Sequence, residues 1–363
     1  MHAVRSATTV PVEVGVSEET KARSGPDADE PEPSRLTARL DRLQRRHPHA
    51  AFPLAVIYKY ADDFGGYLAA LLTYYAVMSL FPLLLLASSI QGFALRQDPQ
   101  LQHEILRSAL AQFPVIGNQL HDPGHVGGGS VGVVVGVVGA LYGSLGAAQA
   151  LQYMMNTAWS VPRNNRPNPL TARGRSLALV AAGGVALLMT TGLSTIGTSS
   201  AGSFGWVLRA ATIAASMVIN AAVFLLAFRI ATSRRLRIQD VAPGAVILAA
   251  GWQLLQSFGV TYVNHVIRNA SATNGVFALV LGLLSFLYLS AVATVLCVEI
   301  NVVRVDHLYP RALLTPFTDN VRLTRGDRKT YRRQAQAQRA KGFQRVDVSF
   351  DDERGRRATA DDR

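Results

Sequence analysis

The stretch Ala69-Ala-Leu-Leu-Thr-Tyr-Tyr-Ala-Val-Met-Ser-Leu-Phe-Pro-Leu-Leu-Leu-Leu86 decides the class of this fold. It belongs to a longer segment in which no charged residue occurs between Tyr67 and Phe93. A helix needs about 20 consecutive, mostly apolar residues to cross a bilayer. The sequence therefore predicts a transmembrane helix over residues 67–93.

The same segment contains side chains that a simple lipid anchor does not need. Helical spacing places three of them, Tyr75, Ser79 and Pro82, on one face. Proline lacks an N–H group, so Pro82 predicts a kink. Two interpretations stay open, because this face either packs inside a helix bundle or lines a path for a substrate. The candidate residues of this helix are Thr73, Tyr74, Tyr75, Ser79 and Pro82.

The 363 residues are 49% hydrophobic and yet carry a formal net charge of +12. The charges gather at the two ends of the chain, which is typical of a multi-pass membrane protein rather than of a soluble domain with a basic surface. We expect no nucleic-acid partner, because arginines beside membrane helices orient the chain and contact anionic lipid. Cys297 is the one cysteine, and no known catalytic or metal-binding motif occurs. We therefore expect no enzyme activity, no cofactor and no metal site.

Six apolar runs follow one another, and arginine-rich flanks alternate with arginine-poor ones. Arginines cluster before the first run and after the second, fourth and sixth runs. Because arginine accumulates on the cytoplasmic side, the alternation predicts an all-α protein with six transmembrane helices and cytoplasmic N- and C-termini. In the second run, small residues recur every four positions at Gly139, Gly143 and Ala147, which favours close helix packing. The predicted helices are 67–93, 131–155, 176–197, 207–229, 241–263 and 276–303.

Three further segments complete the predicted organisation. Residues 1–33 are expected to form a disordered cytoplasmic tail, and residues 34–66 a basic, amphipathic, interfacial lead-in. Residues 304–363 are expected to form a basic and largely disordered cytoplasmic tail. The expected partners of these arginines are anionic lipids of the inner leaflet. Self-association into a homo-oligomer is left open.

Polar side chains recur inside the predicted helices, where each needs a partner or a purpose. On the second helix four of them share a face at spacings of three, four and three, and the fifth and sixth helices carry similar sets. This distribution predicts either an interior hydrogen-bond network or a wet cavity. The further candidates for lining a cavity or for coupling are Gln149, Gln152, Asn156, Trp159, Gln253, Gln256, Tyr288, Glu299 and Asn301.

Glu299 stands out as a carboxylate in the apolar run Val-Leu-Cys-Val-Glu-Ile-Asn-Val-Val. It precedes Arg304 by about one and a half helical turns, so it is expected near the inner interface rather than in mid-membrane. Two roles stay open. It is either a structural group that pairs with an arginine or caps a neighbouring helix, or a carboxylate that couples a proton or substrate to transport.

Four motifs of the chain resemble the YihY/BrkB family of inner-membrane proteins. They are residues 70–84 of the opening stretch, Asn156-Thr-Ala-Trp159, Pro243-Gly244 with Trp252-Gln253, and Glu299-Ile-Asn301. The resemblance covers about residues 50–310. It implies six helices, cytoplasmic ends and the bacterial plasma (inner) membrane. The chain departs from the family in its long tails and in Asn274-Gly275, where Tyr-Gly is commoner.

The resemblance and the polar faces together leave three functions to compare. Members of the family are linked to serum resistance and to export of envelope lipids, so a transporter or flippase-like protein for a lipid-related or amphiphilic substrate is favoured. The alternative is a non-transporting scaffold whose basic tails bind anionic lipid or partners. The family was once labelled a ribonuclease, but the sequence has neither an acidic metal cluster nor a catalytic histidine set, so this function ranks last.

Overall fold

The computed structural model describes residues 48–94, 130–198, 205–268, 272–316, 321 and 323–350. All regular secondary structure within these ranges is helical, as the sequence predicts. The predicted tail 1–33 and the first part of the predicted lead-in lie outside the described residues.

Long helices form the body of the protein, and each contains one of the predicted apolar runs and extends beyond it at both ends. Their N-terminal extensions include polar residues, as at α6, where the Asn168 side chain accepts a hydrogen bond from the Thr171 N–H (2.8 Å) and caps the helix. The helices are α3 (Gly65–Ala94), α5 (Ser130–Ala158), α6 (Pro169–Thr198), α7 (Gly205–Ala231), α8 (Ile238–Arg268) and α9 (Ala272–Asp306).

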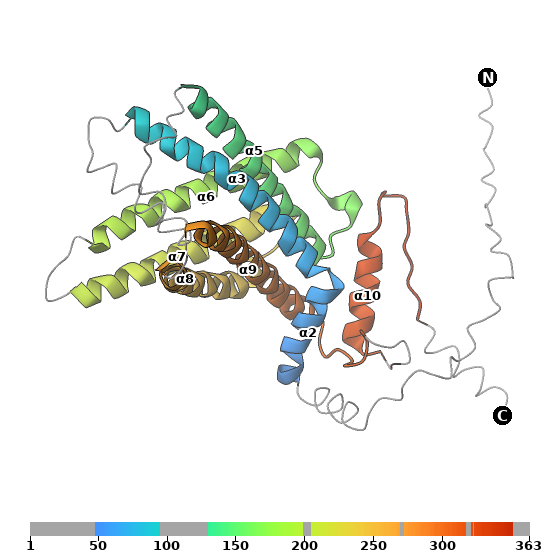
Figure 1. Ribbon diagram of the computed structural model, residues 1–363. Helices are drawn as coiled ribbons and strands as arrows, with labels where there is room; N and C mark the ends of the chain where they lie inside the picture. Colours follow the sequence, from blue (N-terminus) through green and yellow to red (C-terminus); the bar gives the residue numbers. More distant parts are fainter. Residues whose placement is uncertain are drawn as a thin grey trace, which may run out of the picture.

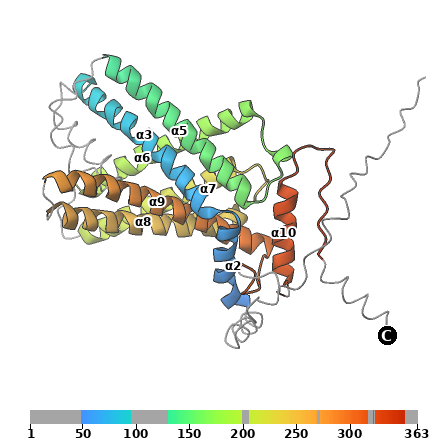
Figure 2. The ribbon, with the colours of Figure 1, turned by 45° about the vertical axis from the view of Figure 1, so that its right-hand side comes forward.

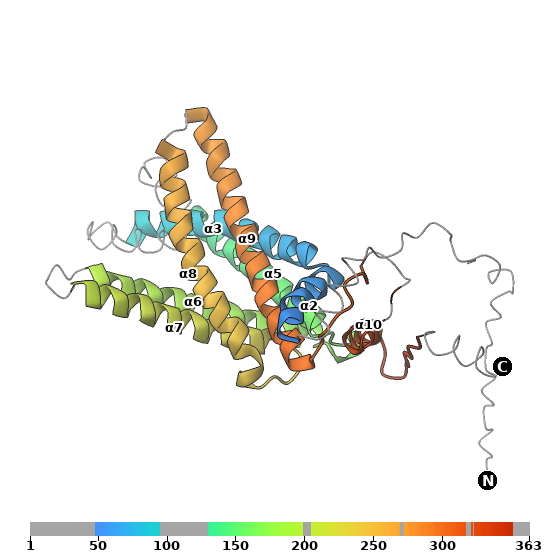
Figure 3. The ribbon, with the colours of Figure 1, turned by 90° about the horizontal axis from the view of Figure 1, so that it is seen from below.

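Five of these helices, α5 to α9, are long and apolar enough to cross a membrane. The sixth, α3, has 30 residues, and its described apolar part is Gly65–Leu80. Helices that follow one another in the chain pack as the pairs α3/α5, α6/α7 and α8/α9, and contacts nearly as extensive as those of α6/α7 join the pairs through α7/α8 and α3/α9. The pairs come together at one end, and Figure 3 shows α6/α7 and α8/α9 diverging from it.

The α3–α5 pair is tight because α5 presents glycines to α3. A Cβ atom on Gly143 would lie only 2.5 Å from the Cα atom of Ser79, and one on Gly146 would overlap the ring of Tyr75. Glycine is therefore needed where the two backbones approach. The close packing predicted from the small-residue repeat is confirmed at Gly143.

Two shorter helices lie at the end where the pairs converge (Figure 2). Helix α2 (Pro48–Asp62) packs against α3 and α9. Helix α10 (Arg325–Ala337) runs across this end of the bundle (Figures 1 and 2). Arginines make hydrogen bonds here too, since Arg304 of α9 donates to the Gln239 carbonyl at the start of α8 (2.5 Å) and Arg339 donates to the Asn164 side chain (3.2 Å). We call this region the polar end.

The segment 304–363, which is expected to be largely disordered, contains the helix α10. A capping box starts this helix, because Thr324 accepts from the Asp327 N–H (3.1 Å) and the Asp327 carboxylate accepts from the Thr324 N–H (2.9 Å). Asp327 and Thr330 are buried. Composition did not indicate this helix, because its buried face is polar and is satisfied by residues distant in the sequence.

Candidate functional site

A cavity of about 490 Å³ lies among the long helices, with walls from all six of them. Its wall is mostly aliphatic and aromatic, and the lining contains no charged side chain among the described residues. The lining residues include Leu72, Ala76, Ala147, Leu151, Val180, Gly183, Phe224, Trp252 and Leu287, with hydroxyls from Thr73, Ser79, Ser144, Ser290 and Thr294.

The hydroxyl groups in this wall donate their hydrogen bonds within their own helices. Thr73 donates to the Ala69 carbonyl (2.8 Å), Ser79 to that of Ala76 (2.8 Å) and Ser144 to that of Ala140 (2.6 Å). Ser290 and Thr294 donate in the same way to Phe286 and Ser290. The wall therefore offers a neutral, weakly polar surface that suits a hydrocarbon chain better than an ion or a sugar.

A buried lysine joins three helices at the polar end. The Lys59 ammonium group pairs with Asp63 one turn along the chain, donates to the Ala158 carbonyl at the end of α5 (3.1 Å) and lies 3.7 Å from a Glu299 carboxylate oxygen. Burial alone would lower the pKa of Lys59, but the carboxylates of Glu299 and Asp63 outweigh it and raise this pKa above its ordinary value. Lys59 is therefore held as a cation.

Glu299 is fully buried on α9, and neither of its oxygens accepts a hydrogen bond from a described residue. Its partner is Lys59 and not Arg304, which donates instead to backbone carbonyls at the start of α8. Pairing with an arginine is one of the roles that the sequence leaves open for Glu299. The structure shows pairing with a lysine of α2 instead. Because Lys59 also pairs with Asp63, two carboxylates share one ammonium group.

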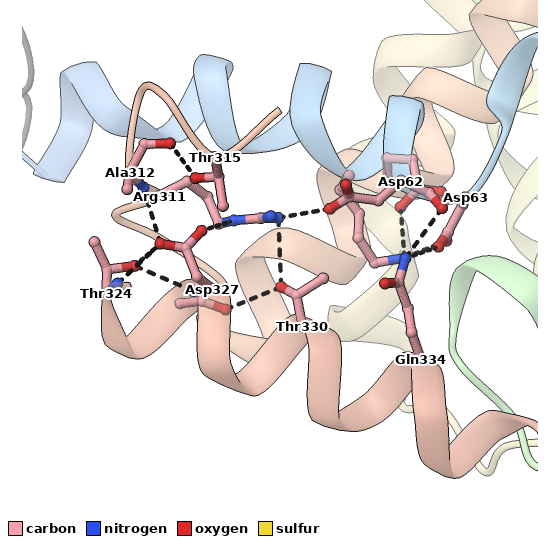
Figure 4. A network of polar contacts seen from close by, with 12 residues as sticks. Asp62, Asp63, Arg311, Ala312, Thr315, Thr324, Asp327, Thr330 and Gln334 are labelled. Carbon is pink, nitrogen blue, oxygen red and sulfur yellow. Dashed lines mark hydrogen bonds and ion pairs between the residues drawn. The ribbon is translucent and has the colours of Figure 1, made fainter. Parts of the chain in front are cut away.

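A buried arginine joins α2 to α10 (Figure 4). The Arg311 guanidinium donates to Asp327 (2.5 Å) and to Asp62 (2.9 Å), and 1% of its side chain is exposed. Burial would lower the pKa of Arg311, but the two aspartates raise it above its ordinary value. Burial raises the pKa of Asp62, and Arg311 opposes this shift. Gln334 of α10 adds hydrogen bonds to the Asp62 carbonyl (3.1 Å) and to Asp63 (3.3 Å).

A third cluster of charged side chains, after those of Lys59 and Arg311, surrounds Asp306 at the end of α9. Arg234 binds this carboxylate with two hydrogen bonds of 2.9 and 3.1 Å, and Arg333 of α10 pairs with it as well. Lys329 donates to the Asp306 carbonyl and so satisfies the C-terminus of α9. The guanidinium of Arg234 also lies over the Trp159 ring, 5.0 Å from its centre.

Two asparagine side chains make hydrogen bonds to backbone groups and take part in none of these ion pairs. Asn156 accepts from the Ser233 N–H (2.9 Å) and donates to the Gln152 carbonyl (2.8 Å), and Gln152 donates to the Ser176 hydroxyl (2.9 Å). Asn301 accepts from the Gly244 N–H (2.9 Å) and donates to the Val241 carbonyl (3.1 Å). These contacts link α5 to α6 and α8 to α9.

The structure distributes the sequence-predicted residues over three environments. Thr73 and Ser79 line the central cavity. Buried contacts at the polar end involve Gln152, Asn156, Trp159, Glu299 and Asn301. Tyr75, Gln253 and Gln256 are half-buried, whereas Tyr74, Gln149 and Tyr288 are exposed. The Pro82 side chain lies outside the described part of the chain.

The motifs and spacings of the sequence did not single out the charged residues of the polar end as site residues: Lys59, Asp62, Arg234, Asp306, Arg311, Asp327 and Arg333. Two signals for them exist in the sequence. Lys59 and Asp63 have the four-residue spacing of a helical ion pair. Thr324-Arg-Gly-Asp327 has the spacing of a capping box.

A second cavity of about 630 Å³ lies at the polar end between α3, α5 and α10, and we name it the basic cavity after its two arginines, Arg163 and Arg166. Arg163 and Arg166 line it together with Asp62 and Asp63, and the exposed rings of Phe64 and Tyr67 form part of its wall. The two aspartates pair with Arg311 and Lys59, and each of these cations also pairs with a second carboxylate, Asp327 or Glu299. Burial lowers the pKa of Arg166, whose guanidinium lies over the Tyr153 ring. No ion pair with a described residue compensates either arginine.

A bundle of long apolar helices with its buried charges gathered at one end defines the class of integral membrane proteins. A family model described as Virulence factor BrkB matches residues 56–316. The chain belongs to this family, the YihY family, which confirms the resemblance seen in the sequence motifs. The family is not known as a family of enzymes. Comparison with curated proteins and with solved structures gave no match.

Proposed function

We propose that this protein spans the bacterial plasma membrane six times, with both termini in the cytoplasm, and moves a lipid-related or amphiphilic substrate. The central cavity carries this proposal. Its volume of about 490 Å³ lies within the range of ~300–1,000 Å³ typical of small-molecule sites, and its wall suits a hydrocarbon chain. All six long helices contribute to it, so a change in their spacing changes access to the cavity.

The basic cavity supports an anionic headgroup on that substrate. Arg163 and Arg166 supply cationic donors, and arginine binds phosphate and carboxylate groups well. The exposed rings of Phe64 and Tyr67 belong to residue types that lie at the lipid headgroup level. In this proposal the cytoplasmic leaflet supplies the substrate, and Glu299 is the coupling group, because it shares Lys59, its cationic partner among the described residues, with Asp63.

The test is a lipid-movement assay in proteoliposomes with a fluorescent anionic lipid. Gly183 lines the central cavity, and a Cβ atom added there meets nothing within 4 Å. We expect Gly183→Leu to fold normally, to fill part of the cavity and to lower the rate of lipid movement by about tenfold. Gly184→Leu is the matched control, because this neighbouring glycine also has open space but does not line the cavity.

A wild-type protein that moves no lipid across a broad panel of headgroups would remove the proposal. Equal rates in the two leucine variants would show that the central cavity is not the route. The scaffold alternative predicts loss of the cellular phenotype when the basic residues before α2 are deleted, whereas a transporter keeps most of its activity. The test deletes only these N-terminal residues, because the basic residues after α9 include α10, which Arg311 and Asp327 hold against the bundle.

A further inference from the structure

A third cavity, of about 420 Å³, lies at the polar end where the segment after α5, the α7–α8 connection and α10 meet. It is separate from the central cavity and shares only Ser160 with the basic cavity. Its described wall consists of Trp159, Ser160, Val161, Pro162, Asn165, Ser233, Arg234, Arg333 and Gln336.

The polar groups of this wall are mainly hydrogen-bond donors. Arg234 and Arg333 bring two guanidinium groups, and none of the described lining residues is acidic. Asp306 pairs with both arginines from outside this wall, which leaves one net positive charge for the three groups. Each guanidinium has five N–H donors, and Asp306 takes two of those on Arg234. About a third of each arginine side chain is exposed, 35% for Arg234 and 29% for Arg333.

Trp159 adds an independent observation. Its side chain is 2% exposed, and its Nε1–H donates to no described residue. An indole N–H can only donate, and a buried donor without an acceptor costs about 1–3 kcal/mol. An acceptor bound in this cavity within reach of Nε1 would satisfy the indole N–H, and the two arginines favour an acceptor with negative charge.

We propose that this cavity binds a phosphate-type anion, held by Arg234, Arg333 and the indole N–H of Trp159. The anion is either the phosphate of a lipid headgroup or a free phosphate ion, because both present the same oxygens to the same donors. The site joins α10 to the loops of the bundle. It does not depend on the proposed transport, since its walls belong to neither the central cavity nor the arginines of the basic cavity.

The indole N–H signals provide the measurement. The chain has three tryptophans, so the ¹⁵N-labelled protein has three indole signals, and Trp159→Phe identifies that of Trp159. One arm titrates inorganic phosphate into the protein in a neutral detergent. The other arm compares nanodiscs of phosphatidylcholine alone with nanodiscs that also contain phosphatidylglycerol. We expect the Trp159 signal to move with at least one of these anions, and the signal of Trp252 in the central cavity to stay in place.

Gln336→Glu tests the charge without breaking the Asp306 pairs, because it places a carboxylate on the cavity wall in a side chain of equal size. We expect it to weaken anion binding by about tenfold or more through repulsion. Arg332→Gln is the matched control, since it changes the net charge equally from an exposed position of α10 outside the cavity.

The two arms distinguish the sources of the anion. A shift with inorganic phosphate assigns a free anion, and a shift only with phosphatidylglycerol assigns a lipid headgroup. A Trp159 signal that moves with neither anion, in a protein whose spectrum shows it folded, overturns the proposal. Equal binding by Gln336→Glu and Arg332→Gln overturns it as well.

Discussion

The polar end and the central cavity of this protein are built in opposite ways. At the polar end, residues of α2, α9 and α10 are joined by buried ion pairs around Lys59, Arg311 and Asp306. In the central cavity, the hydroxyl groups bond within their own helices, and the lining contains no charged side chain among the described residues. The helix pairs are therefore fixed to one another at one end, and their spacing at the cavity can change without breaking a polar contact there.

The largest loss of stability is expected from Arg311→Met. This change leaves the buried carboxylate of Asp327 and the partly exposed carboxylate of Asp62 without their cation, and breaking a buried ion pair costs about 3–5 kcal/mol. We expect a marked fall in the temperature of unfolding in detergent and faster proteolysis of α10. Arg332→Met, at an exposed position of α10, should leave both the unfolding temperature and the rate of proteolysis nearly unchanged. A wild-type-like Arg311→Met protein would show that α10 is not held by this arginine.

A smaller loss of stability is expected from replacing Lys59, which forms ion pairs with Asp63 and Glu299. We expect Lys59→Met to cost about 3 kcal/mol, because two buried carboxylates lose their cation. Glu299→Gln should cost about 1 kcal/mol or less, since Lys59 keeps Asp63 and neither Glu299 oxygen accepts a hydrogen bond from a described residue. The double variant should be more stable than the sum of the single changes predicts, and thermal unfolding of all four proteins measures this coupling. Strict additivity would contradict the shared ion-pair cluster.

Glycine substitutions extend the comparison to the packing of the long helices. Gly143→Ala places a Cβ atom 2.5 Å from the Ser79 backbone, so α3 and α5 must move apart at a cost of about 1–3 kcal/mol. Gly251→Ala meets nothing within 4 Å and should be neutral or stabilising by up to ~1 kcal/mol, because alanine favours the helix. Thermal unfolding of the two variants measures the difference. Equal stabilities would mean that α3 and α5 are not tightly packed at Gly143.

The smallest effect concerns alkaline pH. Because the pKa of Lys59 is raised in the folded protein, its stabilising contribution is fully present below the pKa of an unfolded lysine, ~10.4, and is lost as the pH rises through the higher folded value. The gap in unfolding temperature between wild type and Lys59→Met should therefore stay constant from about pH 7 to 10 and narrow above that range. The corresponding gap for Arg311→Met should stay constant, because a guanidinium keeps its charge. Narrowing near neutral pH would contradict a raised pKa at Lys59.

Local sequence patterns predicted the long helices well and their side-chain contacts only in part. Each apolar run lies inside one helix, because burial in lipid depends on a continuous apolar stretch. Helical spacing placed Gln149 on the same face as Gln152 and Asn156, yet Gln149 is exposed. Spacing gives the direction of a side chain on its own helix, whereas burial depends on how far the neighbouring helix extends beside it.

The contacts of the charged residues could not be derived in this way. Lys59 belongs to a helix that the sequence indicated only as an interfacial segment, and its contact with Glu299 depends on how α2 crosses α9. Asp327 is both a helix cap and an ion-pair partner, and only its capping role leaves a local signal. Ion pairs between distant segments have no periodicity, so an isolated sequence predicts the charges but not their partners.

The Arg311–Asp62 pair has a consequence for the synthesis of the protein, because its partners lie 249 residues apart. A chain made from its N-terminus contains Asp62 long before Arg311 leaves the ribosome. A chain that stops after α9 contains every long helix described above and still lacks this pair. The polar end is thus completed only after the segment that follows α9 has been made, and it distinguishes a chain with its ion pairs in place from one that merely holds the long apolar helices.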